Sequence, residues 1–155
     1  MAPPFPLIVI TGKYLDIVKE EYLLKQASLL WLSKGTVSET LYFDGFSKLW
    51  KSRIKPETFK PTLLKRLLAE TFYNPVLQID RVWTQADTYT IDKLKELIIQ
   101  CINEDDDILT QFIEADNLKA RIQDCQDFFD IIGVLTRYVF DPDEEKIYEE
   151  FPPED

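Results

Sequence analysis

Acidic side chains form two short runs that could supply ligands to a metal ion. The first run is residues 104–107, and the second follows the Asp141-Pro142 dipeptide. Calcium and magnesium prefer the carboxylate oxygens that both runs offer. An EF-hand calcium loop that starts at Asp141 would need glycine at its sixth position and glutamate at its twelfth, but Lys146 and Pro152 stand there. We therefore expect no metal site, and we interpret the runs as a helix cap and a turn.

The segment from Val9 to Lys13 follows an apolar run, where a phosphate-binding loop would stand. A P-loop needs glycine at position 7 and a hydroxyl residue after its lysine, but the chain has Leu7 and Tyr14 there. The chain contains four glycines and no histidine. Without histidine it lacks the common proton shuttle near neutral pH and the usual base of serine or cysteine nucleophiles. We expect a protein that is not an enzyme and binds no cofactor.

Residues 48–66 combine basic and aromatic side chains, a composition that can hold single-stranded nucleic acid by charge and stacking. Trp50 and Phe59 stand there among seven Lys and Arg residues and a single acid. The aromatic residues also repeat at helical spacing, so we prefer the interpretation that they are buried and that the cations cover helix surfaces. The candidate basic patch consists of Lys48, Lys51, Arg53, Lys55 and Lys60.

Charge is distributed unevenly along the chain, whose net charge is −10. Residues 1–102 hold 14 Lys and Arg against 11 Asp and Glu, a net charge of +3, whereas residues 103–155 hold 4 against 17, a net charge of −13. The second region would repel phosphate, so a basic protein surface is favoured as its partner over nucleic acid. The alternative is that these carboxylates only keep the protein soluble. The candidate partner-binding residues are Asp105, Asp106, Asp107, Asp141, Asp143, Glu144 and Glu145.

A long amphipathic helix over residues 105–139 is the element expected to carry much of this acidic region. Apolar residues recur there every three or four positions, which places them on one stripe of a helix, and polar residues fill the other side. We predict one helix, or two shorter ones broken near Asp116-Asn117, with Phe129 and Ile132 buried. The stripe consists of Ile108, Phe112, Ala115, Leu118, Ile122, Cys125, Phe129, Ile132, Leu135 and Val139.

The remaining pattern predicts strands mixed with helices. Alternating or β-branched runs predict strands at residues 6–10, 37–43 and 76–83. Apolar residues at helical spacing predict helices at residues 14–32, 46–54, 63–72 and 90–102. Val139-Phe140 and Ile147-Tyr148 are expected to form a terminal hairpin around the second acidic run.

These elements fit a single domain, residues 1–155, that ends in a short acidic tail at residues 151–155. We predict an α+β fold in which a small sheet of about three strands is covered by helices. An all-α fold with irregular connections is the alternative. No apolar run is long enough to span a membrane, and Cys101 and Cys125 fall on predicted apolar helix faces. We expect buried, reduced thiols and a cytoplasmic protein.

The sequence contains no catalytic signature, and this leads to a hypothesis of function by binding. We expect a non-enzymatic intracellular module whose acidic C-terminal third binds a basic protein. One concrete form is an immunity or inhibitor protein that masks the substrate groove of a basic, nuclease-type toxin. An assembly chaperone or adaptor is an alternative form. A nucleic-acid accessory protein that uses residues 48–66 is a different alternative, which a binding assay with both kinds of partner would separate.

Overall fold

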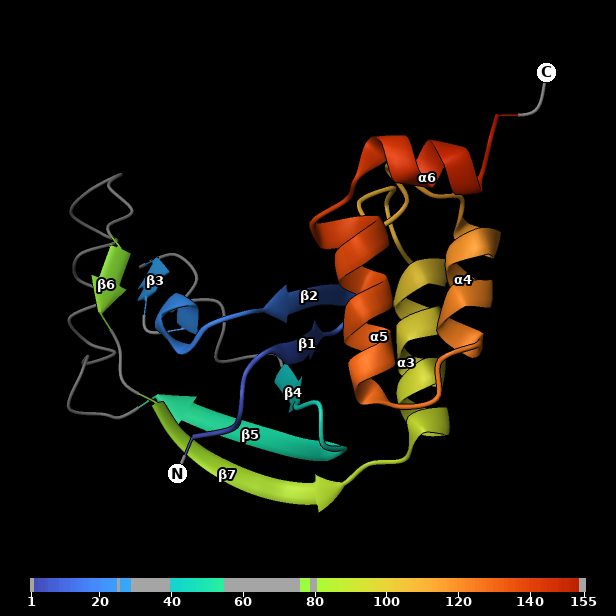
Figure 1. Ribbon diagram of the computed structural model, residues 1–155. Coiled ribbons are helices and arrows are strands. Elements are labelled where there is room, and N and C mark those ends of the chain that lie inside the picture. The colour runs from blue at the N-terminus through green and yellow to red at the C-terminus, as the bar shows by residue number, and fades with distance from the viewer. Residues whose placement is uncertain (1, 25, 29–39, 55–75, 79–80, 154–155) are drawn as a thin grey trace.

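The computed structural model describes residues 2–24, 26–28, 40–54, 76–78 and 81–153. Its strands form a five-stranded antiparallel sheet, in the order β2-β1-β4-β5-β7, and a separate two-stranded sheet of β3 and β6 (Figure 1). The strands of the larger sheet are β1 (Leu7–Thr11), β2 (Tyr14–Val18), β4 (Thr40–Phe43), β5 (Lys48–Ile54) and β7 (Arg81–Thr88). The shorter strands are β3 (Gln26–Ser28) and β6 (Val76–Gln78), and a 3-10 turn, η1 (Glu21–Leu24), precedes β3.

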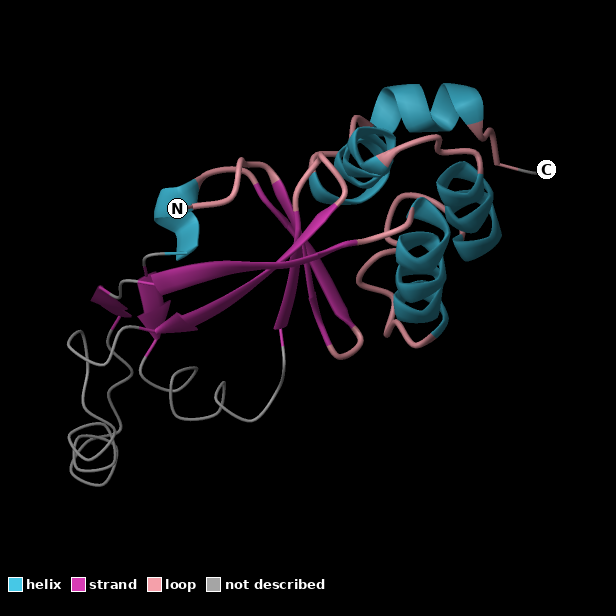
Figure 2. Cartoon of the chain, turned by 90° about the horizontal axis from the view of Figure 1, so that it is seen from below, coloured by secondary structure: helices cyan, strands magenta, loops and turns pink. Residues whose placement is uncertain are grey.

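The helices gather at one end of the larger sheet. They are α3 (Ile91–Asn103), α4 (Ala115–Gln123), α5 (Phe128–Leu135) and α6 (Glu144–Glu150), and a π-helical turn, η3 (Thr136–Phe140), continues α5. In Figure 1 α3, α4 and α5 stand side by side and α6 crosses their upper ends. Figure 2 shows β5 and β7 extending past the helices as a two-stranded ribbon.

The sheet has a buried cluster on each face. Side chains of β1, β2 and β4, such as Ile8, Ile17 and Phe43, pack with α3, α4 and α5 in the main core. Leu7, the neighbour of Ile8, lies on the opposite face with Tyr42 and Trp50. This division follows from the alternation of side chains along a strand.

A hairpin of β1 and β2 stands where the sequence pattern predicts the start of a helix over residues 14–32. That helix prediction is wrong, because its described residues form β2, the short 3-10 turn η1 and β3. Leu15 and Ile17 are buried and Asp16 between them is exposed, as in a strand with one covered face. Gly12, whose φ is +60°, begins the two-residue turn of the hairpin, and glycine adopts this conformation without strain. On β2, which is an edge strand, the carboxylate of Asp16 accepts the backbone N–H of Ile17 at 2.8 Å.

The helix predicted for residues 46–54 is also wrong, because most of that segment is β5. Asp44 is buried, and its carboxylate accepts the backbone N–H groups of Phe46 at 2.7 Å and Lys48 at 3.1 Å. The indole N–H of Trp50 donates to the same carboxylate at 2.8 Å. These bonds fold the chain into the turn between β4 and β5, and they fix Trp50 on its strand.

The other strands and helices predicted before residue 103 agree with the structure in part. The strand predicted at residues 6–10 overlaps β1, and the strand predicted at 37–43 is described only as β4. The strand predicted at residues 76–83 is divided between β6 and β7. The helix predicted at residues 63–72 lies outside the described residues. The helix predicted at residues 90–102 is confirmed as α3, and Thr90 caps it by accepting the N–H of Lys93.

The single long helix predicted over residues 105–139 is wrong. The chain is irregular before α4 and breaks again at residues 124–127, not near Asp116-Asn117. Carboxylates stabilise both irregular segments. Asp105 accepts two backbone N–H groups of the first segment, and Asp127 caps α5 by accepting the N–H of Asp130 at 2.8 Å.

These breaks change which apolar residues are buried. Phe128 is fully buried, whereas Phe129, which the stripe places in the core, is 47% exposed. Leu109 and Ile113 are likewise buried in place of Ile108 and Phe112. Ile132 is buried as predicted.

The end of the chain and the size of the sheet also need correction. The terminal hairpin predicted around residues 141–145 is wrong, because α6 occupies this segment after the N-cap Asp143. The fold is α+β, but its sheet of five strands replaces the predicted sheet of about three, and the all-α alternative is wrong. Short helices replace the predicted long one.

Candidate functional site

The first acidic run lies in the loop after α3, and most of its carboxylates have partners within the molecule. Asp105 accepts the backbone N–H groups three and four residues further on, at 3.2 and 2.9 Å. Asp106 forms an ion pair with Lys13 of the β1–β2 turn, with 2.7 Å between the carboxylate oxygen and Nζ. Asp107 is exposed and has a φ of +64°. Asp105 and Asp106 therefore have structural roles.

The second acidic run begins after η3 and continues into α6. Asp141 lies 3.8 Å from the ammonium group of Lys19, which follows β2. Asp143 is the N-cap of α6 and accepts the N–H three residues further on at 3.3 Å. Glu144 and Glu145 are exposed in the first turn, where negative charge interacts favourably with the helix dipole.

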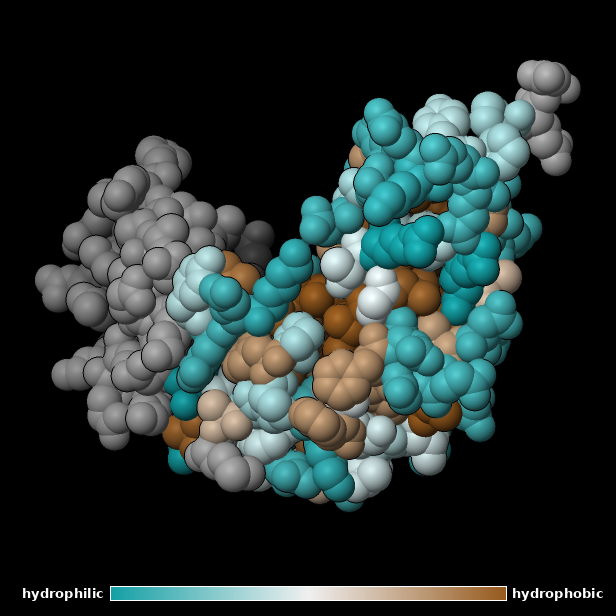
Figure 3. Space-filling model, viewed as in Figure 1, coloured by the Kyte–Doolittle hydropathy of each residue, from teal (hydrophilic) through white to brown (hydrophobic). Residues whose placement is uncertain are grey.

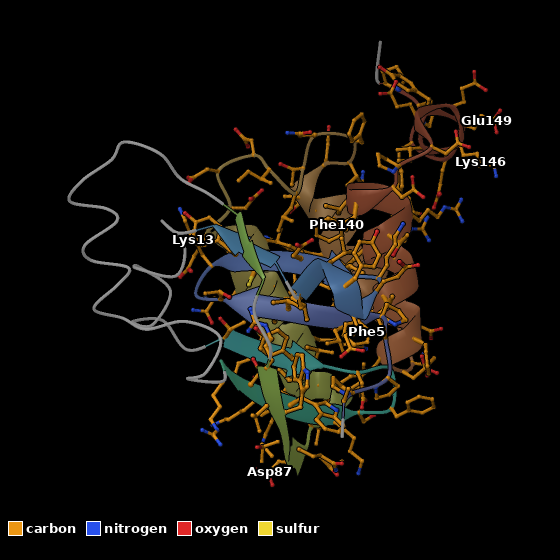
Figure 4. All side chains as sticks on the ribbon, turned by 90° about the vertical axis from the view of Figure 1, so that its left-hand side faces the viewer. Phe5, Lys13, Asp87, Phe140, Lys146 and Glu149 are labelled. Atoms are coloured by element: carbon orange, nitrogen blue, oxygen red, sulfur yellow. The ribbon has the colours of Figure 1, made fainter. Side chains whose placement is uncertain are left out.

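The two acidic runs do not form one surface. Their ion-pair partners Lys13 and Lys19 flank opposite ends of β2, and six residues of extended chain span about 20 Å. Figure 4 shows Lys13 on one side of the molecule and Lys146, whose ammonium group is 4.0 Å from Asp143, on the other. The structure thus divides the predicted partner-binding residues into two clusters, each with a lysine beside it.

The described part of the candidate basic patch lies on β5. Lys51 and Arg53 are exposed, and the ammonium group of Lys48 donates to the hydroxyl of Thr88 at 2.8 Å. Trp50 is 3% exposed, so its ring is part of a core cluster and offers no stacking surface. The remaining predicted residues of the patch, Lys55 and Lys60, lie outside the described residues.

A groove that the sequence pattern does not predict lies between α6 and residues 110–114. It consists of two adjoining hollows of about 410 and 740 Å³. Two of its aromatic side chains reach solvent, since Phe112 is 37% and Tyr148 is 63% exposed. Glu114 and Glu144 supply one carboxylate from each wall, and the described lining residues include no lysine or arginine. We name this feature the acidic groove.

The sequence pattern does not reveal the acidic groove, because it assigns two of the aromatic residues of the groove to other structures. The helical stripe places Phe112 in the core, and the predicted terminal hairpin places Tyr148 on a strand. A signal for α6 is nevertheless present, because Asp143 followed by two glutamates is typical of a helix N-terminus. Recognising that start would have placed Tyr148 on a helix.

A second groove, of about 510 Å³, runs between α4 and α5. At one end Arg121 and Arg137 converge on Glu150 of α6. Arg121 forms an ion pair with one carboxylate oxygen, and Nη2 of Arg137 lies 3.2 Å from the other. The hydroxyl of Tyr138 donates to the same carboxylate at 2.7 Å, and the guanidinium of Arg121 also lies 5.2 Å from the ring centre of Phe151. We name this feature the arginine groove.

The two cysteines are buried, as predicted, at 2% exposure for Cys101 and 5% for Cys125, and they are not bonded to each other. Cys125 lines the arginine groove. Burial, with a smaller contribution from the carboxylate of Asp130, raises the pKa of Cys125 to about 11. Burial also raises the pKa of Cys101. Thiols with raised pKa values are poor nucleophiles at neutral pH.

Comparisons with known proteins assign no family. No protein-family profile, no curated protein and no solved structure matches the chain. Within the described ranges, no three His, Cys, Asp or Glu side chains come together as a group that could hold a metal ion. The described helices include none with the length and apolar character needed to cross a membrane. The two grooves are the features of the described residues that could bind a partner.

Proposed function

We propose that the protein is a non-enzymatic, intracellular protein-binding module and that its acidic groove takes a basic segment of a protein partner. One observation carries the proposal: exposed aromatic rings and carboxylates from both walls line the same groove. Of the predicted partner-binding residues, only Glu144 lines this groove.

Lysine and arginine side chains suit such a groove for two reasons. A cation over the face of Tyr148 or Phe112 gains about 0.5–2 kcal/mol, depending on how far it is desolvated. Glu114 and Glu144 can accept charge-assisted hydrogen bonds from the same cation. The aliphatic stems of lysine and arginine also cover aromatic surface. Aromatic anchors within a polar rim are the usual composition of energetically dominant sites in protein interfaces.

The form of the proposal that best suits a chain of 155 residues with a net charge of −10 is an immunity or inhibitor protein. Its partner would be a nuclease-type toxin, because an enzyme that binds phosphate backbones has a basic substrate groove. Excess negative charge would speed the encounter with such a groove. An assembly chaperone would bind a basic segment in the same way, and the identity of the partner separates the two forms.

The test begins with capture of a partner from a lysate of the native host, followed by binding measurements with the purified partner. The test variant carries Glu114→Gln and Glu144→Gln. The control carries Glu145→Gln and Glu149→Gln, which also removes two carboxylates but none that lines the groove. We expect the test variant to weaken binding at least about tenfold, the effect of losing one charged hydrogen bond, and the control to change it much less.

Two results would contradict the proposal. Equal losses in both double variants would mean that diffuse negative charge, and not the groove, attracts the partner. A specific partner that is a nucleic acid, or a protein without a basic surface, would exclude the proposed chemistry. Melting temperatures of all variants are measured alongside, so that loss of folding is not mistaken for loss of binding.

A further inference from the structure

The arginine groove has an apolar middle with open space above it. Its walls include Val134 of α5 and the ring of Phe129. Gly133 lies between them on α5, and a Cβ added there would meet no atom within 4 Å. The groove is open to solvent along its length, which suits a segment of a macromolecule better than an enclosed small molecule.

The two ends of the arginine groove carry opposite charges. Asp124 and Asp130 lie near the connection between α4 and α5. Arg121 starts from the last turn of α4, but its guanidinium pairs with Glu150 of α6, and so does the guanidinium of Arg137. Seven residues separate Asp130 from Arg137, which corresponds to about 10 Å along a helix axis. A ligand that lies along the groove therefore meets carboxylates and guanidinium groups about two helical turns apart.

The arginines are held in place but retain hydrogen-bonding capacity. Glu150 pairs with one terminal nitrogen of each, and the guanidinium of Arg137 also lies 5.3 Å from the ring centre of Tyr138. The Arg121 side chain is 40% exposed and the Arg137 side chain is 56% exposed. Each guanidinium has five N–H donors, so one internal carboxylate does not use them all. Two arginines that share one carboxylate can therefore still attract a second carboxylate from a ligand.

An exposed aromatic pair extends the apolar surface beyond the groove. Phe129 of α5 packs edge to face on Phe46 of the β4–β5 turn, with 5.1 Å between ring centres. Phe129 is 47% exposed and Phe46 is 62% exposed. Gly45 permits this contact, because a Cβ there would lie 2.4 Å from the ring of Phe129. Figure 3 shows hydrophobic atoms reaching the surface where the helices meet the sheet. Exposed aromatic rings beside arginines are typical of protein interfaces.

We propose that the arginine groove is a second interaction surface, which takes an amphipathic helix of a protein partner. The helix presents a carboxylate to Arg121 and Arg137 and a cation to Asp124 and Asp130. Between these charges its apolar side chains cover Gly133 and the ring of Phe129. Charge complementarity at both ends and the open middle define this occupant, which is distinct from the basic segment proposed for the acidic groove.

The probe is a phage-displayed library of helical peptides of about 18 residues, or five helical turns. Peptides are selected on the wild-type protein and tested against Gly133→Leu, which fills the groove, and against Gly133→Ala, which adds one methyl group. The Cβ of either variant meets no atom within 4 Å, and melting temperatures check that both variants fold. We expect selected peptides to carry an acid and a base about two turns apart. We expect them to bind Gly133→Leu at least tenfold more weakly and Gly133→Ala nearly normally.

A double-mutant cycle then tests the charge contact. The glutamate of one selected peptide is changed to glutamine and combined with Arg137→Gln in the protein. Non-additive losses support the contact, with each single change costing about tenfold in affinity. Additive losses, equal binding to Gly133→Leu, or a selection that yields no acidic peptide would overturn the proposal. A dimer of the protein that Gly133→Leu dissociates would also overturn it, since the occupant would then be a second copy of the chain.

Discussion

The acidic groove and the arginine groove are neighbours on the helical side of the molecule, yet they present different charges. Glu150 lines one of them and neutralises part of the other. Residues 103–155 contain only four cations, and two of these, Arg121 and Arg137, converge on this one carboxylate. A net charge of −13 over a region therefore does not define an acidic surface. Local ion pairing decides where the excess charge is accessible.

The largest effect is expected from Phe128, the buried support of α5. Phe128→Ala should destabilise the protein by about 3–5 kcal/mol, because it opens a cavity in the main core. Phe129→Ala should cost only about 1 kcal/mol, since its ring is half exposed and packs on Phe46 at the surface. Denaturant unfolding of the two variants checks this contrast. Equal losses of stability would show that the buried face of α5 is assigned wrongly.

The next effect concerns the thiol at the arginine groove. Because the pKa of Cys125 is raised from 9.0 to about 11, its thiolate fraction at pH 8 should be about a hundredfold below that of an unshifted thiol. Labelling with a thiol reagent should therefore be slow in the native protein and fast in denaturant. By linkage, the stability that this group contributes is complete below pH 9 and is lost as the pH rises towards 11.

A labelling control separates the two grooves. Cys101→Ala leaves Cys125 as the single reporter, and a helical peptide in the arginine groove should slow its labelling further. A basic peptide in the acidic groove should not, because no cysteine lines that groove. Rapid labelling of native protein at pH 8 would contradict the buried, protonated assignment.

Glu150→Gln should make the arginine groove more positive and should lower the stability of the protein moderately. The change removes two ion pairs, and we expect a loss of about 1–2 kcal/mol, reduced from the usual value for charged bonds because both arginines are partly exposed. The arginine groove should then bind acidic peptides more tightly. Glu149→Gln on the same helix is the matched control, and Figure 4 shows this side chain pointing outward. Equal melting temperatures for the two variants would argue against the Glu150 network.

The smallest effect is expected at Gly133. Gly133→Ala should stabilise the protein by about 0.5–1 kcal/mol, because alanine favours the helix and meets no neighbour. Gly45→Ala, in contrast, must displace the ring of Phe129 and should lower the melting temperature. The two changes add the same methyl group, in one case inside a helix with open space beside it and in the other case in a turn against an aromatic ring. Destabilisation by Gly133→Ala would show that the arginine groove is more filled than described.

The sequence predicts those elements whose signals are local. For α3, the cap Thr90 and an unbroken apolar stripe lie within one segment, and the helix follows. Over residues 105–139 the apolar residues keep a spacing of three or four positions, although the chain passes through two irregular segments. Periodicity cannot distinguish a helix from a loop that repeats the same spacing, so Phe112 and Phe129 are assigned to the core although they face solvent.

The candidate sites depend on contacts that no local pattern contains. Lys13 and Asp106 are separated by 93 residues, so their ion pair cannot be inferred from the acidic run alone. Glu114 and Glu144 likewise come from different segments, and α6 brings them to one groove. Charge counting therefore identifies a region rich in carboxylates but cannot identify which of them are available to a partner.

The hydrogen bond between Asp16 and Ile17 has a consequence for behaviour at high concentration. An edge strand with an unused N–H donor is a template on which strands of other molecules add. On β2 the carboxylate of Asp16 takes the N–H of Ile17, and Lys13 and Lys19 place charge beside both ends. The side chain of Asp16 reaches solvent, but partial desolvation by its neighbours raises the pKa of its carboxyl group, so this protection weakens at a less acidic pH than for an ordinary aspartate. Acidification should therefore favour fibril growth, and light scattering should show a weaker pH dependence for Asp16→Asn.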